Sequence, residues 1–130
     1  MIGASTPEDR RYLRTHEWAQ EKEGILRVGI TDHAQSELTD IVFVELPAVG
    51  KEVVAGGPLL VLESVKTVAD VYAPATGSVS AVNEALRKNP GLVNQDPYGE
   101  GWILELRVAP SAARSELLDA AGYRASLLAP

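Results

Sequence analysis

Lys66 has the clearest setting for chemistry in this sequence, because it stands between two apolar, β-forming runs. Residues 59–62 lead up to it and residues 68–72 lead away, with a short polar segment between the two runs. This pattern is typical of a β-hairpin. Pro58 and Pro74 stand at equal distances on either side of the lysine and bound the hairpin. We therefore expect a lysine amine at the tip of a hairpin, open to modification.

The residues around Lys66 carry a more specific signal than the lysine alone. Lysines are common on exposed turns, so Lys66 by itself fits a solvated charge as well as a functional amine. Val65, however, is an apolar residue at a tip that water should cover, which favours a surface that a second molecule contacts. In addition, the segment Glu63, Ser64, Val65, Lys66 resembles the lipoyl-attachment motif.

The two histidines, His16 and His33, predict neither a metal site nor a catalytic centre. The sequence has no cysteine, so it offers no thiolate nucleophile and no disulfide. Without cysteine, the two histidines would need carboxylates to complete a zinc site, and their spacing fits no metal motif. His33 is expected to be structural. Any sulfur chemistry would have to come from an attached group.

Composition and charge argue against several classes of partner. With 130 residues, 45% of them hydrophobic, the chain fits a single domain, 1–130, with a buried core. The net charge of -6 argues against nucleic acid and against an anionic membrane. No apolar run approaches the ~20 residues of a membrane span, and the first residues resemble neither a signal peptide nor a transit peptide. We expect a cytoplasmic bacterial protein that is a monomer in isolation.

Short strands are expected to position the residues named above. Turn residues recur every few positions, which is typical of a mainly β fold, an all-β sandwich or flattened barrel. The core of this fold is expected over about residues 12–108. Residues 41–46 are apolar on both faces and predict a buried strand.

Two short helices complete the predicted fold. The first is expected near residue 33, with Asp32 as its cap and Gln35 completing a capping box. The second is expected from residue 112 to about residue 121, with Gly122 as its C-terminal stop. It would lie in a C-terminal helical segment at about 111–128.

Six sequence blocks, in order and at this spacing, resemble the H-protein family of the glycine cleavage system over about residues 12–123. That resemblance implies a lipoyl/biotinyl-type flattened barrel or sandwich of short antiparallel strands, hammerhead-like in shape. Thr39 and Thr67 depart from the family, which usually has Gly and Ala there. The matching blocks are residues 15–18, 28–35, 40–47, 63–66, 70–74 and 92–102.

The resemblance implies that lipoate is attached covalently to Lys66, as N6-lipoyllysine. It also implies that Glu63, Ser64, Val65 and Gly77 belong to the attachment site, with Glu63 and Gly77 at positions recognised by lipoate-attaching enzymes. Simpler interpretations stay open for two of them. Glu63 also fits a solvated turn acid, and Gly77 fits a tight turn.

The resemblance further implies that Thr15, Glu17 and Asp70 line a cleft for the arm when it carries an aminomethyl group. Such a group, bonded to both sulfur and nitrogen, loses its amine in water, so a carrier should shelter it and pair its ammonium with acceptors. Without the resemblance, Glu17 and Asp70 would be interpreted as the outward-facing polar residues of strands.

The implied role is that of a non-catalytic shuttle. Its partners would be the pyridoxal-phosphate enzyme glycine decarboxylase, a tetrahydrofolate-dependent aminomethyltransferase, dihydrolipoyl dehydrogenase and the lipoate-attaching enzymes. Two alternatives stay open, a relay carrier that donates lipoate to other enzymes and an unmodified interaction module. A biotin carrier is disfavoured because Val65 and Thr67 flank the lysine where methionines are usual. A tethered lipoyl domain is disfavoured because the sequence shows no flexible linker.

Overall fold

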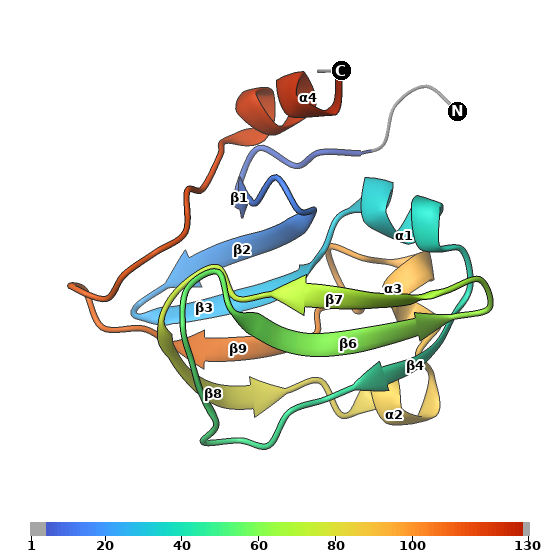
Figure 1. The fold of residues 1–130 in the computed structure, drawn as a ribbon, viewed down its shortest axis with the longest axis horizontal. Coiled ribbons are helices and arrows are strands. Elements are labelled where there is room, and N and C mark those ends of the chain that lie inside the picture. The colour runs from blue at the N-terminus through green and yellow to red at the C-terminus, as the bar shows by residue number, and fades with distance from the viewer. Residues whose placement is uncertain (1–4, 129–130) are drawn as a thin grey trace.

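A computed structural model describes residues 5–128, and within this range the chain forms two antiparallel sheets (Figure 1). Residues 1–4 and 129–130 of the expected domain lie outside the described residues. The larger sheet has the strand order β1-β2-β3-β9-β8-β5, and the smaller has the order β4-β6-β7. Within the described residues neither sheet closes on itself, so the fold is the sandwich form of the two expected architectures.

Most strands are short, as expected. They are β1 (Arg11–Tyr12), β2 (Glu17–Lys22), β3 (Ile25–Ile30), β4 (Ile41–Glu45), β5 (Glu52–Val53), β6 (Pro58–Ser64), β7 (Val68–Tyr72), β8 (Gly77–Val82) and β9 (Leu104–Arg107). The helices are α1 (Asp32–Leu38), α2 (Ala85–Lys88), α3 (Leu92–Gln95) and α4 (Ala120–Leu128).

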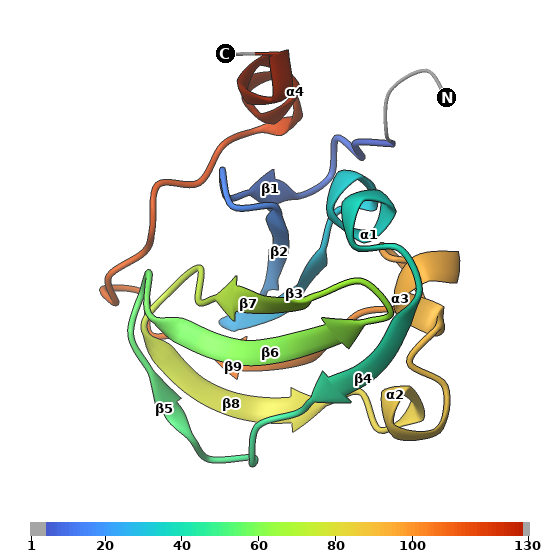
Figure 2. The ribbon, with the colours of Figure 1, turned by 45° about the vertical axis from the view of Figure 1, so that its right-hand side comes forward.

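The two sheets share one apolar core. In Figures 1 and 2 the smaller sheet lies against β8 and β9 of the larger sheet. Leu62 and Val71 of the smaller sheet belong to the same buried cluster as Leu104 and Leu106 of β9. Because successive side chains of a strand face opposite sides, the smaller sheet has a second, outer face that this core does not cover.

The predicted hairpin around Lys66 is confirmed. β6 and β7 pair in antiparallel fashion, with Glu63 opposite Val68 and Val61 opposite Asp70. Lys66 therefore lies in the turn between the strands.

The prediction that residues 41–46 form a strand buried on both faces is wrong. β4 pairs only with β6, at the edge of the smaller sheet, and its register shifts between Ile41 and Phe43. Val42 and Phe43 are 52% and 49% exposed. The apolar composition does not reveal this exposure, because an edge strand with an uncovered apolar face has the same composition as a buried strand.

Asp32 does not cap the first helix, contrary to the prediction. Thr31 is the cap, and its side-chain oxygen accepts the Ala34 N–H at 3.1 Å. Asp32 is the first helical residue, and the Gln35 side chain donates to its carboxylate at 2.8 Å. Thr39 ends the helix with φ at 61°, so the turn at this departure from the family pattern does use a positive backbone angle.

The C-terminal helix begins later than predicted. Residues 111–119 are not helical, and Gly122 lies inside α4 rather than at its end. Leu118 exchanges backbone hydrogen bonds of 2.7 and 2.8 Å with Tyr12, which holds this segment as an extended chain beside β1. α4 then places Tyr123 in a second buried cluster with Tyr12 and Trp18, at the end of the molecule where Figure 2 shows α4 above β1.

Candidate functional site

The Ser64 side chain organises the turn that carries Lys66. Its hydroxyl oxygen accepts the backbone N–H groups of Lys66 at 3.1 Å and of Thr67 at 3.0 Å. The Ser64 N–H donates to the Thr67 carbonyl at 2.8 Å. The Ser64 side-chain oxygen thus accepts the Thr67 N–H, which the Ser64 carbonyl would accept in an ordinary two-residue turn, and it accepts the Lys66 N–H as well. Ser64 belongs to the expected attachment motif, but no pattern in the sequence predicts this structural role.

The tip is also braced from outside the hairpin. The Val65 N–H donates to the Asp40 carbonyl at 3.0 Å, and the exposed Lys66 amine donates to the Glu37 carbonyl at 3.2 Å. Both acceptors belong to α1 or to the connection that follows it. The turn that carries Lys66 is therefore fixed by hydrogen bonds from Ser64 within the hairpin and from the α1 region outside it, while the lysine side chain stays exposed to solvent.

The outer face of the smaller sheet surrounds the tip with exposed apolar and acidic side chains. Phe43, Glu63 and Val68 lie opposite one another on β4, β6 and β7, so their side chains share one face. Val68 is 64% exposed, and Val65 at the tip is 68% exposed. The sequence-based expectation of an uncovered Val65 is confirmed, and the apolar surface extends beyond it to Phe43.

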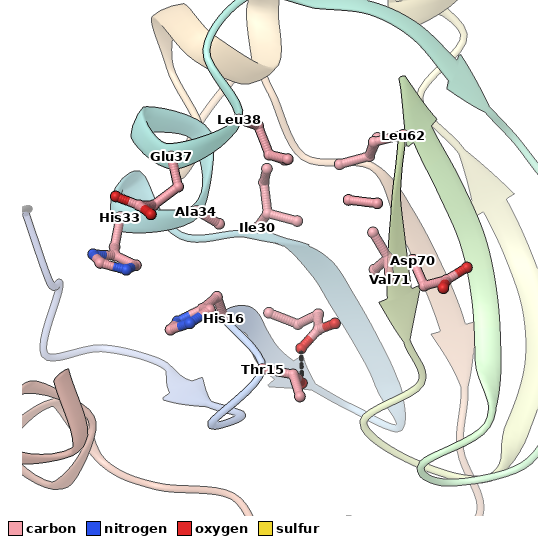
Figure 3. Close-up of a pocket in the computed structure, with 12 residues that line it drawn as sticks. Thr15, His16, Ile30, His33, Ala34, Glu37, Leu38, Leu62, Asp70 and Val71 are labelled. Atoms are coloured by element: carbon pink, nitrogen blue, oxygen red, sulfur yellow. Dashed lines mark hydrogen bonds between the residues drawn. The ribbon is translucent and has the colours of Figure 1, made fainter. Parts of the chain in front are cut away.

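A cavity of about 220 Å³ lies on the opposite side of β7, between β2, α1 and the inner face of the hairpin (Figure 3). Lys66 reaches its rim, because the lysine amine bonds to Glu37, which lines the cavity. The lining residues are Thr15, His16, Glu17, Ile30, His33, Ala34, Glu37, Leu38, Leu62, Ala69, Asp70 and Val71.

Glu17 is the buried carboxylate of this cavity. Its side chain is 1% exposed and accepts two hydrogen bonds, one from the Thr15 hydroxyl and one from the Tyr72 N–H at 2.7 Å. Burial raises the pKa of Glu17, and these two hydrogen bonds oppose the rise. Within residues 5–128 no ion pair joins Glu17 to a cationic side chain. A buried carboxylate without a cation is costly, so the cavity favours a cationic ligand.

Asp70 borders the same cavity, but its side chain has a different orientation. Asp70 is exposed, and Figure 3 shows its carboxylate pointing away from Thr15 and His16. Its neighbours Ala69 and Val71 alternate with it along β7 and face the interior, since successive residues of a strand point to opposite sides. The structure thus brings together the backbones of the three residues expected in a cleft, but only Thr15 and Glu17 are in side-chain contact.

Gly77 lies at the far end of the molecule from Lys66. It begins β8 and pairs with Val53, and in Figures 1 and 2 the start of β8 is at the side opposite the β6–β7 turn. A Cβ at Gly77 would overlap the Arg107 carbonyl oxygen. The close approach of two strands explains this glycine without any contact to the hairpin tip.

His16 and His33, which the sequence did not assign to the site, both line the cavity. Their ring centroids lie 4.7 Å apart, and His16 adopts a positive φ of 80° between Thr15 and Glu17. Burial lowers the pKa of His16, and the neighbouring His33 lowers it further. The available signal was the position of His16 between two expected cleft residues. Across residues 5–128, no group of three histidine, aspartate or glutamate side chains is arranged to hold a metal ion.

None of the described helices is long and apolar enough to cross a membrane.

Comparisons with known proteins point in one direction. A family model described as "Glycine cleavage H-protein" matches residues 10–129. A glycine cleavage system H protein of Thermus thermophilus is 54% identical over 118 residues, which cover 91% of this chain and 92% of that protein. A probable glycine cleavage system H protein of Natronomonas pharaonis is 52% identical over 121 residues, covering 93% and 95%. The crystal structure of a glycine cleavage system H protein from Mycobacterium marinum superposes with a TM-score of 0.88 at 41% identity, covering 95% and 99%.

Proposed function

Because the chain belongs to the glycine cleavage H-protein family, we propose that Lys66 carries the lipoyl group with which it serves glycine cleavage. The family role is that of a lipoyl carrier. The observation that carries the assignment to Lys66 is its position: an exposed amine on a braced hairpin turn, at the rim of a cavity with a buried carboxylate. Glu63, Ser64 and Val65 complete the attachment site.

The site fits lipoate. The Lys66 amine is exposed and its hydrogen-bond partner is a single backbone carbonyl, so amide formation costs one hydrogen bond that the amide N–H can replace. When bound to Lys66, lipoate would supply a disulfide that is reduced as it takes up the aminomethyl group of glycine and that stays on the lysine as a dithiol once the group has been passed on. The braced turn fixes the point from which the arm extends, which limits the positions its far end can reach.

The cavity residues contribute binding and exclusion of water. Glu17 accepts an ammonium group, and Thr15 keeps the carboxylate oriented by donating to it. Ile30, Leu62 and Val71 form an apolar wall, which keeps water from the aminomethyl carbon and strengthens the pairing with Glu17. Asp70 stands at the rim. Through these residues the chain protects a labile group and performs no chemical step on it.

The partners that follow from this role are glycine decarboxylase, the aminomethyltransferase, dihydrolipoyl dehydrogenase and the lipoate-attaching enzymes. All of these enzymes must reach Lys66, and its exposed position on the turn allows each of them to bind there in turn. The acidic chain, with a net charge of -6, favours partners with basic surfaces and contacts that weaken as salt rises.

Intact mass of the protein from its native host tests the modification. We expect the mass of one lipoyl group, lost in Lys66→Arg and kept in Lys51→Arg, a matched change at another exposed lysine. A biotin mass, or no addition in any form, would overturn the proposal.

A glycine–bicarbonate exchange assay with glycine decarboxylase then tests the role in glycine cleavage. We expect exchange with the wild type and none with Lys66→Arg. Equal exchange by both proteins would overturn the arm mechanism, and a lipoylated protein without exchange would favour the relay role.

A further inference from the structure

One phenol hydroxyl connects two walls of the cavity. The Tyr123 Oη lies 2.7 Å from the Nδ1 of His16 and 2.8 Å from the Thr31 Oγ1. His16 belongs to the turn before β2, and Thr31 is the cap of α1, so a residue of the C-terminal helix joins both. Tyr123 is 1% exposed, and its ring stacks on Tyr12 at 4.8 Å between centroids.

The hydrogen bonds of Thr31 determine which atom donates and which accepts in the chain of hydrogen bonds between Thr31, Tyr123 and His16. Thr31 is completely buried, and its Oγ1 already accepts the Ala34 N–H. Its own hydroxyl proton needs an acceptor, since buried donors are almost always paired. Among residues 5–128 the acceptor found for it is the Tyr123 Oη. Tyr123 must then donate its proton to the other partner, the Nδ1 of His16.

This direction fixes the state of His16. A nitrogen that accepts a hydrogen bond carries no proton, so the ring is neutral and its proton is on Nε2. Protonation at Nδ1 would reverse the chain and leave the buried Thr31 hydroxyl without an acceptor.

The ionisable groups around His16 have opposing effects on its charge. They are His33 and Glu37 of α1, Glu17 of β2 and Tyr123 of α4. His33 and burial disfavour the charged ring, whereas Glu37 favours it.

We propose that Tyr123 is a positioning residue of the cleft, whose hydroxyl holds His16 neutral with its proton on Nε2. His16 and Glu17 line the same cavity, so a cationic His16 would repel the ammonium group of the aminomethyl arm. Tyr123 thus keeps a second cation out of the cavity in which the arm docks. This inference rests on the proposed function, because it assumes that the loaded arm docks in this cavity.

The first test measures His16 directly and needs no arm. Nitrogen-15 NMR of the histidine rings is compared in the wild type, Tyr123→Phe and the matched control Tyr12→Phe. The Tyr12 hydroxyl donates to the Pro7 carbonyl at 2.5 Å and has no part in the His16 chain. Both substitutions therefore remove one buried hydroxyl from the same stacked pair.

We expect the Nε2–H tautomer of His16 in the wild type and in Tyr12→Phe. In Tyr123→Phe we expect a mixture of tautomers and a higher titration midpoint, because the lost hydrogen bond favours the neutral ring. An Nδ1–H tautomer in the wild type, or identical spectra for the two variants, would overturn the assignment.

The second test measures the lifetime of the aminomethyl-loaded protein between about pH 5 and pH 8, where histidine titrates. Relative to Tyr12→Phe, the Tyr123→Phe protein should lose its amine about two- to tenfold faster near the acidic end, the effect of one neutral hydrogen bond. The difference should shrink as pH rises. A constant ratio would overturn the role of Tyr123 in sheltering the arm.

The two tests separate this inference from the proposed function. If Lys66 is never lipoylated, the proposed function fails while the NMR result still decides the tautomer. If the protein is lipoylated and loaded but both variants lose amine equally, the proposed function stands and the inference fails.

Discussion

Replacing Glu17 by Gln should remove the buried charge of the cavity while preserving its shape. The Tyr72 N–H cannot reorient, so the amide oxygen of the new side chain should face it. The amide nitrogen would then face the Thr15 hydroxyl, which can rotate and accept instead of donating. Both existing hydrogen bonds therefore have a replacement, and we expect Glu17→Gln to fold normally.

The expected loss is that of a charge-assisted hydrogen bond to the ammonium group of the arm. Hydrogen bonds to charged groups contribute about 1.5–3 kcal/mol, and about 1.4 kcal/mol corresponds to a factor of ten. Docking of the loaded arm should therefore weaken by about 10- to 150-fold. Because an undocked arm is exposed to water, the lifetime of the aminomethyl group should fall toward that of a free aminomethyl thioether.

The assay is the release of ammonia and formaldehyde from protein that has been loaded with labelled glycine and separated from the decarboxylase. Glu52→Gln is the matched control, because it removes the same charge from an exposed position on a strand that does not line the cavity. Equal lifetimes for the wild type and Glu17→Gln, with Glu52→Gln also unchanged, would refute the assignment of Glu17 as the ammonium acceptor.

The same substitution has a signature in the unloaded protein. Burial raises the folded-state pKa of Glu17 above its ordinary value of 4.5. The folded state then binds the proton more tightly than the unfolded state, so this contribution to stability is present below pH 4.5 and is lost as pH rises through the folded pKa. Relative to Glu17→Gln, the wild type should lose stability over that range in urea titrations. A difference that does not vary with pH would contradict the burial argument.

Further predictions concern positions that the family resemblance places in the site. Gly77→Ala should lower the free energy of unfolding by about 1–3 kcal/mol, because the added Cβ would overlap the Arg107 carbonyl oxygen; an unchanged urea midpoint would contradict this. Glu63→Gln should leave stability within about 0.5 kcal/mol yet slow attachment of lipoate, measured by mass over time, and equal attachment rates would leave Glu63 as a solvated acid. Asp70→Asn should shorten the loaded lifetime by at most about fivefold, because an exposed ion pair contributes at most about 1 kcal/mol; a loss as large as that of Glu17→Gln would show that its carboxylate turns into the cavity.

Local sequence pattern was sufficient for the hairpin, because both strands and the turn lie within one continuous segment. The alternation of β-forming residues around Lys66 predicts the pairing of β6 and β7, and the polar tip predicts an exposed lysine. Patterns of this kind report on a strand and its turn. They do not report what covers each face, which is why the sequence of β4 predicts a buried strand although Phe43 is half exposed.

The cavity depended on contacts between distant segments, which no local pattern contains. Glu17 has the alternation expected of an outward-facing residue, and its burial follows from the packing of β7 and α1 against β2. The start of α4 was missed for a similar reason. The Tyr12–Leu118 hydrogen bonds keep residues before Ala120 extended, although their composition favours a helix.

The β6–β7 hairpin has two sides with different neighbours, so binding in the cavity and binding to the outer side involve different residues. The cavity adjoins Leu62 and Val71 on the inner side, whereas Phe43, Glu63 and Val68 are uncovered on the outer side. An enzyme that binds the outer side does not have to displace an occupant of the cavity. Its affinity for the loaded and the empty carrier can therefore be nearly equal. The order in which enzymes act on the carrier would then be set by the chemical state of the arm and not by differences in affinity.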